Sequence, residues 1–130
     1  MMNIESLVET DVEAVYAYTA TEVVRSKLSE KPFFSIIDED DQYLGVITSR
    51  DIFRQSYHLV VDCLKDKPKV YPDHALLDTI SLMLRLQEEA LPVFHNDDSF
   101  MGVVSKDKLV SFLLRYTVHL ENQAVQGKNL

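Results

Sequence analysis

The chain has 130 residues, of which 46% are hydrophobic and 26% charged, a composition typical of a soluble globular domain rather than a disordered segment. Its formal net charge of −8 argues against nucleic acid as the main partner, because affinity for phosphate backbones comes from clustered Lys and Arg. Its apolar runs fall far short of the roughly 20 residues that span a bilayer, and no signal peptide is recognisable. We therefore expect a cytoplasmic protein without membrane insertion.

The first predicted element is a short segment at residues 4–7, Ile-Glu-Ser-Leu, which resembles Val-Asp-Cys-Leu at 61–64 and is expected to mirror a helix that links two repeats. A strand that carries Tyr16 and Tyr18 on one face precedes a helix that ends before Pro32. Residues 17–24 match 70–77 at an offset of 53, whereas the strands that follow match at 57. The difference, 57 minus 53, is four residues or about one helical turn, so this helix is expected to be shorter than its counterpart at 75–86.

A β-hairpin is predicted next, with strands at 33–37 and 43–48 around a polar turn at 38–41. Its sequence Asp-Asp-Gln-Tyr-Leu-Gly-Val-Ile-Thr at 40–48 returns as Asp-Asp-Ser-Phe-Met-Gly-Val-Val-Ser at 97–105, within a second hairpin of strands at 91–94 and 100–105. Helical spacing of apolar residues follows each hairpin, over 52–64 and over 109–120. Pro68 ends the first of these helices, and 69–71 is predicted as a short strand. Two such repeats are each too small to bury a separate core, so we expect them to pack on each other.

The first hairpin ends in the motif Gly-Val-Ile-Thr-Ser-Arg-Asp at 45–51, which places a hydroxyl and a carboxylate three residues apart at a strand-to-helix junction. One interpretation is a capping box of about 1 kcal/mol, in which the Thr48 hydroxyl accepts from a backbone amide while Asp51 reaches back. The other is a nucleotide site, in which Asp51 accepts from the two ribose hydroxyls and Arg50 faces phosphate near the helix start. The spacing fits both interpretations.

These repeated units, the motif at 45–51 and Ala-Leu-Pro-Val-Phe at 90–94 resemble a tandem pair of cystathionine-β-synthase (CBS) domains over nearly the whole chain. The resemblance implies an α/β (α+β) fold in which two β-α-β-β-α repeats pack as a pseudo-twofold module that commonly dimerises. It divides the chain into repeat 1 with its N-terminal linker segment at 1–58 and repeat 2 with a C-terminal helix at 59–130. It also implies that adenosine-containing ligands bind in clefts between the repeats.

Carried over by position, the resemblance assigns a ligand site to repeat 1. Asp51 would hold the ribose hydroxyls, while Thr48 and Arg50 would face phosphate. The adenine pocket would be lined by Tyr16, Tyr18, Phe34 and Ser35. The two tyrosines suit an ordinary sheet face equally well.

Repeat 2 departs from the pattern at residues 102–108, Gly-Val-Val-Ser-Lys-Asp-Lys, because Lys108 stands where the family has the ribose-binding carboxylate. Asp107 comes one residue early, at a helix azimuth that differs by about 100°. A second site would consist of Tyr71, Pro92, Ser105, Lys106 and Lys108. Lys106 and Lys108 would serve phosphate there, although a solvated side chain is the favoured interpretation for Lys108.

Other chemistry is not favoured by the sequence. The acidic turns at 38–41 and 97–98 suit hairpin conformations better than a metal ion, and the four histidines fall on separate segments, so we expect neither a metal site nor a required cofactor. No nucleophile with a base and no acid–base pair is evident from spacing, so no enzymatic activity is expected. Cys63, the single cysteine, is expected to be buried and unreactive.

Two functions remain. In the first, a homodimer of the tandem module senses an adenosine-containing ligand (AMP, ADP, ATP, NAD or S-adenosylmethionine) and changes its association with an unidentified regulated protein. In the second, the chain is a ligand-free interaction or dimerisation module in which Asp51 only caps its helix. The apolar stripe of the last helix suits core packing and can also lie at a dimer interface.

Overall fold

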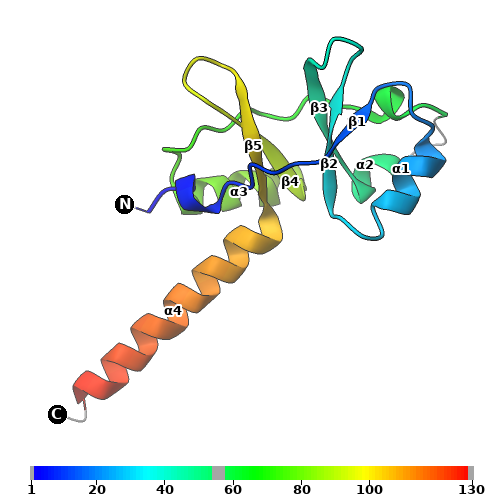
Figure 1. Ribbon diagram of the computed structural model, residues 1–130. Coiled ribbons are helices and arrows are strands. Elements are labelled where there is room, and N and C mark those ends of the chain that lie inside the picture. Colours follow the sequence, from blue (N-terminus) through cyan, green and yellow to red (C-terminus); the bar gives the residue numbers. More distant parts are fainter. Residues whose placement is uncertain (1, 54–57, 129–130) are drawn as a thin grey trace.

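Two α/β units lie side by side, and one long helix leads away from them (Figure 1). The computed structural model describes residues 2–53 and 58–128. Repeat 1 consists of β1 (Ala14–Tyr16), α1 (Thr21–Lys27), β2 (Phe33–Ile37), β3 (Tyr43–Thr48) and α2 (Ser49–Phe53). Repeat 2 consists of α3 (Leu76–Leu86), β4 (Ala90–Phe94), β5 (Phe100–Ser105) and α4 (Lys106–Lys128). Each repeat follows a 3-10 turn: η1 (Glu5–Leu7) opens the chain, and η2 (Val60–Cys63) lies between the repeats.

Both predicted hairpins are present, and they agree down to local irregularities. Strands β2 and β3 are antiparallel, as are β4 and β5, and each pair shifts register at the same place, between Ile36 and Ile37 and between Val93 and Phe94. The turns also correspond, because Asp41 and Asp98 both adopt the left-handed conformation, with φ of 60° and 64°. Asp tolerates this conformation better than most residues do. Residues that match at an offset of 57 in the sequence therefore also have the same backbone conformation in the two hairpins.

The segment at the start of repeat 1 matches the segment at the start of repeat 2 at an offset of 55 residues, not at the predicted 53. Val15 of β1 lies opposite Ile36 in parallel pairing, and Val70 forms an isolated parallel bridge with Val93, so the strand predicted at 69–71 is a single bridge. The helix N-caps Ala20 and Ala75 share this offset of 55, where the sequence comparison gave 53. Tyr18 consequently lies in the turn after β1, not on the strand.

Helix α1 is four residues shorter than α3, as the sequence predicted, with 7 residues against 11. The connection after α1 is longer and restores part of the missing length, which explains why the offsets of the strand and the hairpin differ by two rather than four.

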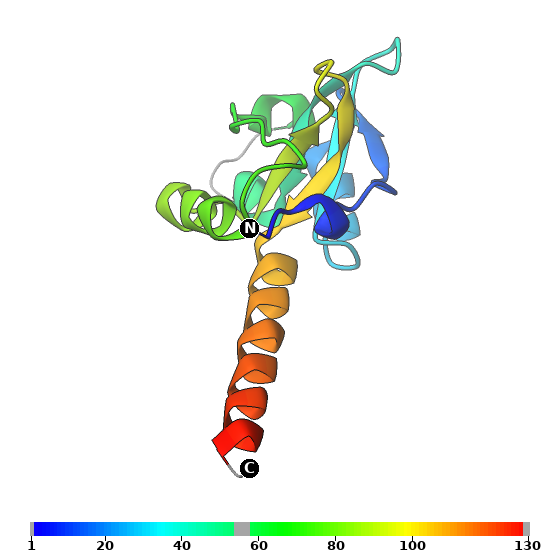
Figure 2. The same ribbon diagram turned by 90° about the vertical axis from the view of Figure 1, so that its left-hand side faces the viewer.

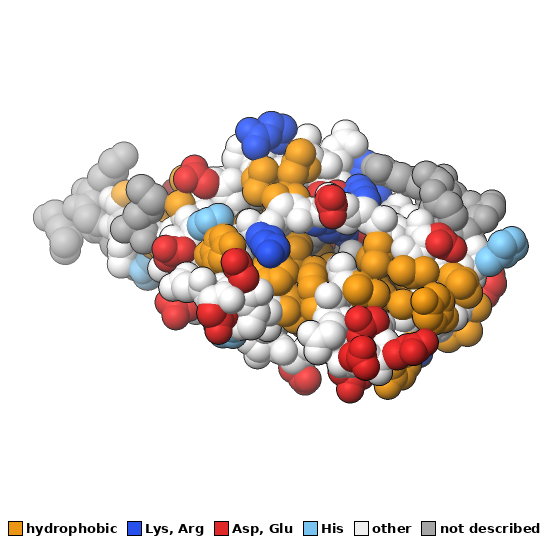
Figure 3. All heavy atoms as spheres, turned by 90° about the horizontal axis from the view of Figure 1, so that it is seen from above, with side chains coloured by type: hydrophobic (Ala, Val, Ile, Leu, Met, Phe, Trp, Pro, Cys, Tyr) orange, Lys and Arg blue, Asp and Glu red, His pale blue; other side chains and the backbone are white. Residues whose placement is uncertain are grey.

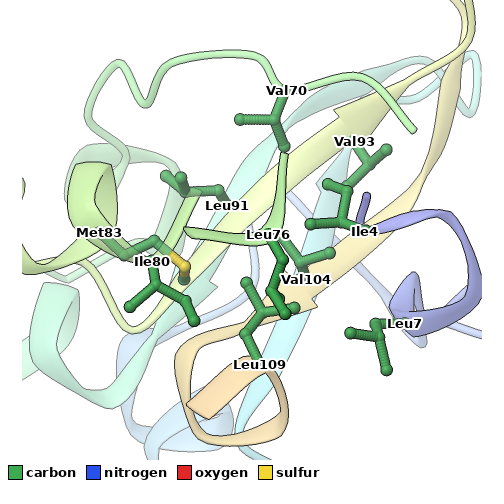
Figure 4. Packing of buried hydrophobic residues seen from close by; sticks show 10 residues of the cluster. All are labelled: Ile4, Leu7, Val70, Leu76, Ile80, Met83, Leu91, Val93, Val104 and Leu109. Carbon is green, nitrogen blue, oxygen red and sulfur yellow. The ribbon is translucent and has the colours of Figure 1, made fainter. Parts of the chain in front are cut away.

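The N-terminal segment packs on repeat 2, whereas the segment between the repeats packs on repeat 1. Ile4 and Leu7 lie in the same core cluster as Leu76 and Leu91 of repeat 2 (Figure 4). Val60 and Cys63 occupy the corresponding places in the core of repeat 1. Each repeat is therefore completed by the segment that precedes the other repeat. The two segments play equivalent roles, as the likeness of 4–7 to 61–64 predicted, but the residues that correspond are one position earlier than predicted, Ile4 with Val60 and Leu7 with Cys63.

The helix predicted over 52–64 is wrong in its second half. Leu59 is extended, with φ −116° and ψ 144°, and the chain then forms the short turn η2. Leu59 bridges Ala20, and flanking backbone bonds join Thr21 N–H to the His58 carbonyl and Val60 N–H to the Thr19 carbonyl. These backbone bonds to repeat 1 hold the chain extended at Leu59, so the apolar spacing does not produce an α-helix there. The 3-10 turn η2 still buries two residues three positions apart, Val60 and Cys63. The part of the prediction at 54–57 lies outside the described residues.

A third cluster joins the repeats through equivalent residues of the two hairpins: Phe33 with Ala90, and Val46 with Val103. Helix α4 begins beside this assembly and then projects from it, as both ribbon views show (Figures 1 and 2). Within the described residues, no helix combines the length and apolar character needed to cross a membrane.

Candidate functional site

Asp51 is the most enclosed of the predicted ligand-site side chains that carry a charge, because its carboxylate is 1% exposed in the first turn of α2. Thr48 donates to Asp51 Oδ2 twice, from its backbone N–H at 2.8 Å and from its hydroxyl at 3.1 Å. Asp51 thus reaches back to the start of the helix as a capping box requires. The hydroxyl, however, donates to the carboxylate, whereas the expected cap had it accepting from an amide.

Two lysines and a second carboxylate surround Asp51. Lys67 Nζ lies 2.7 Å from Asp51 Oδ2 and 3.5 Å from Glu88 Oε2, and its side chain is only 3% exposed. Lys65 Nζ lies 2.7 Å from Glu88 Oε1 and 3.8 Å from Asp51 Oδ1. We call these four residues the Asp51 cluster. Its two positive and two negative groups balance, which is the condition under which charges tolerate burial.

The Asp51 cluster connects both repeats. Asp51 belongs to α2 of repeat 1, the lysines to the segment after η2, and Glu88 to the connection between α3 and β4. A neighbouring bond makes the same connection, because Arg50 donates to the Gln87 side chain at 2.8 Å. Sequence reasoning did not identify Lys65, Lys67 or Glu88. The available signal was the pair of lysines before Pro68 in an acidic chain, but spacing alone does not show which carboxylate they approach.

The charges are reversed at the equivalent position of repeat 2. Lys108 stands in place of Asp51 and lies 3.5 Å from Glu9 Oε1, in the segment before repeat 1. Ser105 accepts from the Lys108 backbone N–H at 3.3 Å, which is the hydroxyl cap that repeat 1 lacks. Lys106 pairs with Glu89 at 3.0 Å. Both lysines of the predicted second site therefore form ion pairs and remain partly exposed to solvent, so their assigned role in binding phosphate stays a prediction.

The other predicted residues are spread over several places. Phe34 is buried in the core of repeat 1, whereas Tyr16 and Tyr18 are 58% and 66% exposed. Ser35 lines a cavity of about 640 Å³ near the hairpin turns. Thr48 and Arg50 share a cavity of about 330 Å³ with Ser105, between the starts of α2 and α4. Tyr71 donates to Asp98 at 2.8 Å, which raises the pKa of its phenol. The roles assigned to these side chains stay predictions.

A smaller cavity is lined by the two lysines of the Asp51 cluster and by a third lysine, Lys69. Its volume is about 160 Å³, and it is lined by Lys65, Lys67 and Lys69 together with Asp66 and the predicted second-site residue Pro92. Lys69 Nζ also lies 4.6 Å from the centre of the Phe94 ring. This arrangement concentrates positive charge locally on a chain whose net charge is −8.

The face that carries the hairpin turns is apolar at its centre, with acidic and basic side chains around it (Figure 3). Tyr43 and Phe100, which occupy equivalent positions, stack there with ring centres 4.3 Å apart. Burial raises the pKa of the Tyr43 phenol. In the described ranges, the structure gathers no group of three or more His, Cys, Asp or Glu side chains that could hold a metal ion.

Comparison with known proteins identifies the family. The CBS domain model matches the chain twice, over residues 4–58 and 60–115. One similar solved structure is CBSX2 in complex with AMP, which has 19% identity, a TM-score of 0.73 and coverage of 90% of this chain and 99% of that one. A CBS domain protein from Thermoplasma acidophilum has 15% identity, a TM-score of 0.72 and coverage of 89% and 76%. The cytosolic domain of the Mg2+ channel MgtE in complex with ATP has 21% identity, a TM-score of 0.63 and coverage of 85% and 48%.

No curated protein matches the sequence. The similar solved structures share too little sequence to show more than the fold, but the two family matches follow each other along most of the chain. CBS-pair domains are regulatory modules and are generally non-catalytic. The two matches fall on two units that share the order helix, two antiparallel strands, helix, and they show that this protein belongs to the CBS domain family as a tandem pair.

Proposed function

We propose that this protein is a non-enzymatic regulatory module that senses an adenosine-containing ligand, such as AMP, ADP, ATP, NAD or S-adenosylmethionine, at Asp51. The observation that carries the proposal is the enclosed Asp51 carboxylate with two lysines beside it. A carboxylate is an acceptor for the two ribose hydroxyls, and ammonium groups are ordinary partners of phosphate. The complexes of CBSX2 with AMP and of MgtE with ATP support this class of ligand.

The signal in this proposal is a change in association. Ligand at Asp51 alters the contacts that connect α2 with Gln87 and Glu88 of repeat 2, and so alters the relation of the two repeats. This change in the relation of the repeats alters a homodimer formed through α4. It also alters the association of that dimer with an unidentified regulated protein. The buried free thiol of Cys63 suits a reducing compartment, which supports a cytoplasmic location.

The decisive experiment is mass spectrometry of small molecules released from the purified protein, followed by calorimetric titration with AMP, ATP, NAD and S-adenosylmethionine. Asp51→Asn is expected to weaken binding of the ligand at least about tenfold, because a neutral amide is a poorer acceptor than a carboxylate. Asp62→Asn, at an exposed position on η2, is the matched control and is expected to bind as the unaltered chain does. Unchanged affinity in Asp51→Asn contradicts the site.

The second candidate is a ligand-free interaction module, and one observation favours it. Asp51 already accepts from Thr48 and Lys67, which gives the carboxylate a structural role without any ligand. In this case Asp51→Asn lowers the melting temperature by the same amount with and without nucleotide. A melting temperature of the unaltered chain that rises with nucleotide concentration counts against this candidate.

A further inference from the structure

Lys67 places its ammonium on the Asp51 carboxylate that the two ribose hydroxyls would need, and it occupies one of the two oxygens, Oδ2. The Nζ to Oδ2 distance is 2.7 Å, and the lysine side chain is almost completely buried. Taking the proposed function as given, we infer that Lys67 occupies the Asp51 carboxylate in place of a ligand and, with Lys65, moves to the phosphate of a nucleotide that binds there. Lys67 thereby selects phosphorylated nucleosides over nucleosides.

The Asp51 cluster is incompletely satisfied as it stands. Within the described part of the chain, Asp51 Oδ1 and Glu88 Oε2 are buried and have no hydrogen-bond partner. A buried acceptor left unsatisfied in this way destabilises a fold, so such atoms indicate where a further donor binds. Two adjacent ribose hydroxyls supply two donors to one carboxylate. Lys67 supplies a donor to only one of the two oxygens.

Lys67 can leave Asp51 without losing every negative partner. Glu88 Oε2 lies 3.5 Å from the same ammonium, and it is one of the two unsatisfied acceptors. A lysine side chain is a flexible four-carbon stem with a compact charge, so a small movement exchanges one acceptor for the other. Arginine, with its rigid fork, would not make this exchange as readily.

The released ammonium has an anion site beside it. Lys65, Lys67 and Lys69 line the cavity of about 160 Å³, with Asp66 as its acidic residue. Whole ligands occupy pockets of about 300–1,000 Å³, so this volume suits a phosphate group and not a complete nucleotide. A nucleoside alone must displace Lys67 from Asp51 and leaves its ammonium with Glu88 as the remaining carboxylate. A nucleotide offers the phosphate, which is the basis of the selectivity.

The test is calorimetric titration of the full chain with adenosine, AMP and inorganic pyrophosphate. In Lys67→Met the ratio of AMP affinity to adenosine affinity is expected to fall about tenfold, because AMP loses a charge-assisted contact while adenosine loses its competitor. Lys65→Met is expected to lower the same ratio by about threefold, since the Lys65 side chain is more exposed than that of Lys67 and solvent screens its charge. Lys31→Met is the matched control, because it removes a lysine from an exposed ion pair with Glu13.

Circular dichroism establishes that each variant is folded, and Lys65→Met decides the question should the buried Lys67→Met not fold. An unchanged ratio in the folded variants overturns the inference and leaves the proposed function standing. Pyrophosphate binding that needs Lys65, with no binding of adenosine or AMP, rejects the proposed function but retains an anion site at the lysines. No binding of any of the three probes overturns both.

Discussion

At the scale of single residues, equivalent positions of the two repeats have different chemistry. Asp51 and Lys108 occupy the same place in their repeats, yet one is paired with Lys67 and the other with Glu9. Each pair joins the start of a helix in one repeat to the segment that precedes the other repeat. The loss of the carboxylate in repeat 2 is therefore accompanied by an acidic partner for the lysine, and the structural contact persists with its charges exchanged.

Tyr43 offers a pH-dependent prediction at this scale. Burial raises the pKa of its phenol above the ordinary value of about 10. Since the folded state keeps the proton that the unfolded state releases, this contribution is complete below about pH 10 and is lost as the pH rises through the folded pKa.

We expect the free energy of unfolding, measured by urea denaturation, to fall more steeply between about pH 9 and pH 11.5 in the unaltered chain than in Tyr43→Phe. Phenylalanine is the natural residue at the equivalent position, Phe100, so the substitution suits the stacked pair. Parallel pH profiles of the two proteins refute the assignment. Lysine deprotonation affects both proteins and cancels in the comparison.

At the scale of elements, α4 is the one that lies furthest from the rest of the fold. Leu109 is buried, and Phe112 and Leu113 pack against the core of repeat 2, so the predicted stripe is a core stripe over its first half. Tyr116 and Leu120 continue it into the projecting part, where they are exposed. A second exposed stripe, Leu114, Val118 and Val125, lies on another side of the same helix. A helix with apolar groups on two sides favours association.

We expect the chain to be a homodimer in solution and Leu114→Glu with Val118→Glu to make it a monomer, because charge is placed where apolar surface would be buried. Sedimentation equilibrium measures the molecular mass of the unaltered chain and of the double variant in solution. Arg115→Gln, on the exposed part of the same helix, is the control that should leave the dimer intact. A monomeric unaltered chain, or a double variant that remains dimeric, contradicts a role of this stripe in dimerisation.

At the scale of the whole molecule, the two repeats depend on each other through the segments that precede them. Ile4 is completely buried in repeat 2, and Val60 is completely buried in repeat 1. Gly102 marks how closely the N-terminal segment approaches β5, since a Cβ there would meet the Glu9 carbonyl oxygen at 2.2 Å. Backbone bonds between Glu9 and Val103 hold this contact.

We expect Ile4→Ala to destabilise the fold by about 2–4 kcal/mol and to raise amide hydrogen exchange first in α3 and β4, far along the sequence. Val60→Ala is the matched substitution in the other repeat and is expected to act first on α1 and β2. Mass spectrometry of exchange resolves these regions. Exchange that rises first in β1 and β2 for Ile4→Ala shows that the segment does not act through repeat 2.

The sequence predicted the parts of the fold that depend on local pattern. The duplicated hairpins and the shorter α1 follow from spacing and turn residues, and the structure confirms them. The equivalent role of the segments near 4–7 and 61–64 is also confirmed, but their register was predicted one residue too late, since Ile4 corresponds to Val60. The helix over 52–64 failed because bonds from Ala20 and its neighbours hold Leu59 extended. The predicted boundary between the repeats, which places 1–58 in repeat 1 and 59–130 in repeat 2, stays a prediction.

The sequence by itself determined that the chain is two copies of one unit and that Asp51 and Lys108 differ, because both statements concern residues compared at a fixed offset. Only the tertiary structure decided that Lys65, Lys67 and Glu88 surround Asp51, and that Glu9 lies against Lys108. Ionic contacts between residues so far apart in the chain depend on how the segment before each repeat packs on the other repeat. No spacing rule contains that information, because it arises from the burial of Ile4 and Val60 in cores built by other parts of the chain.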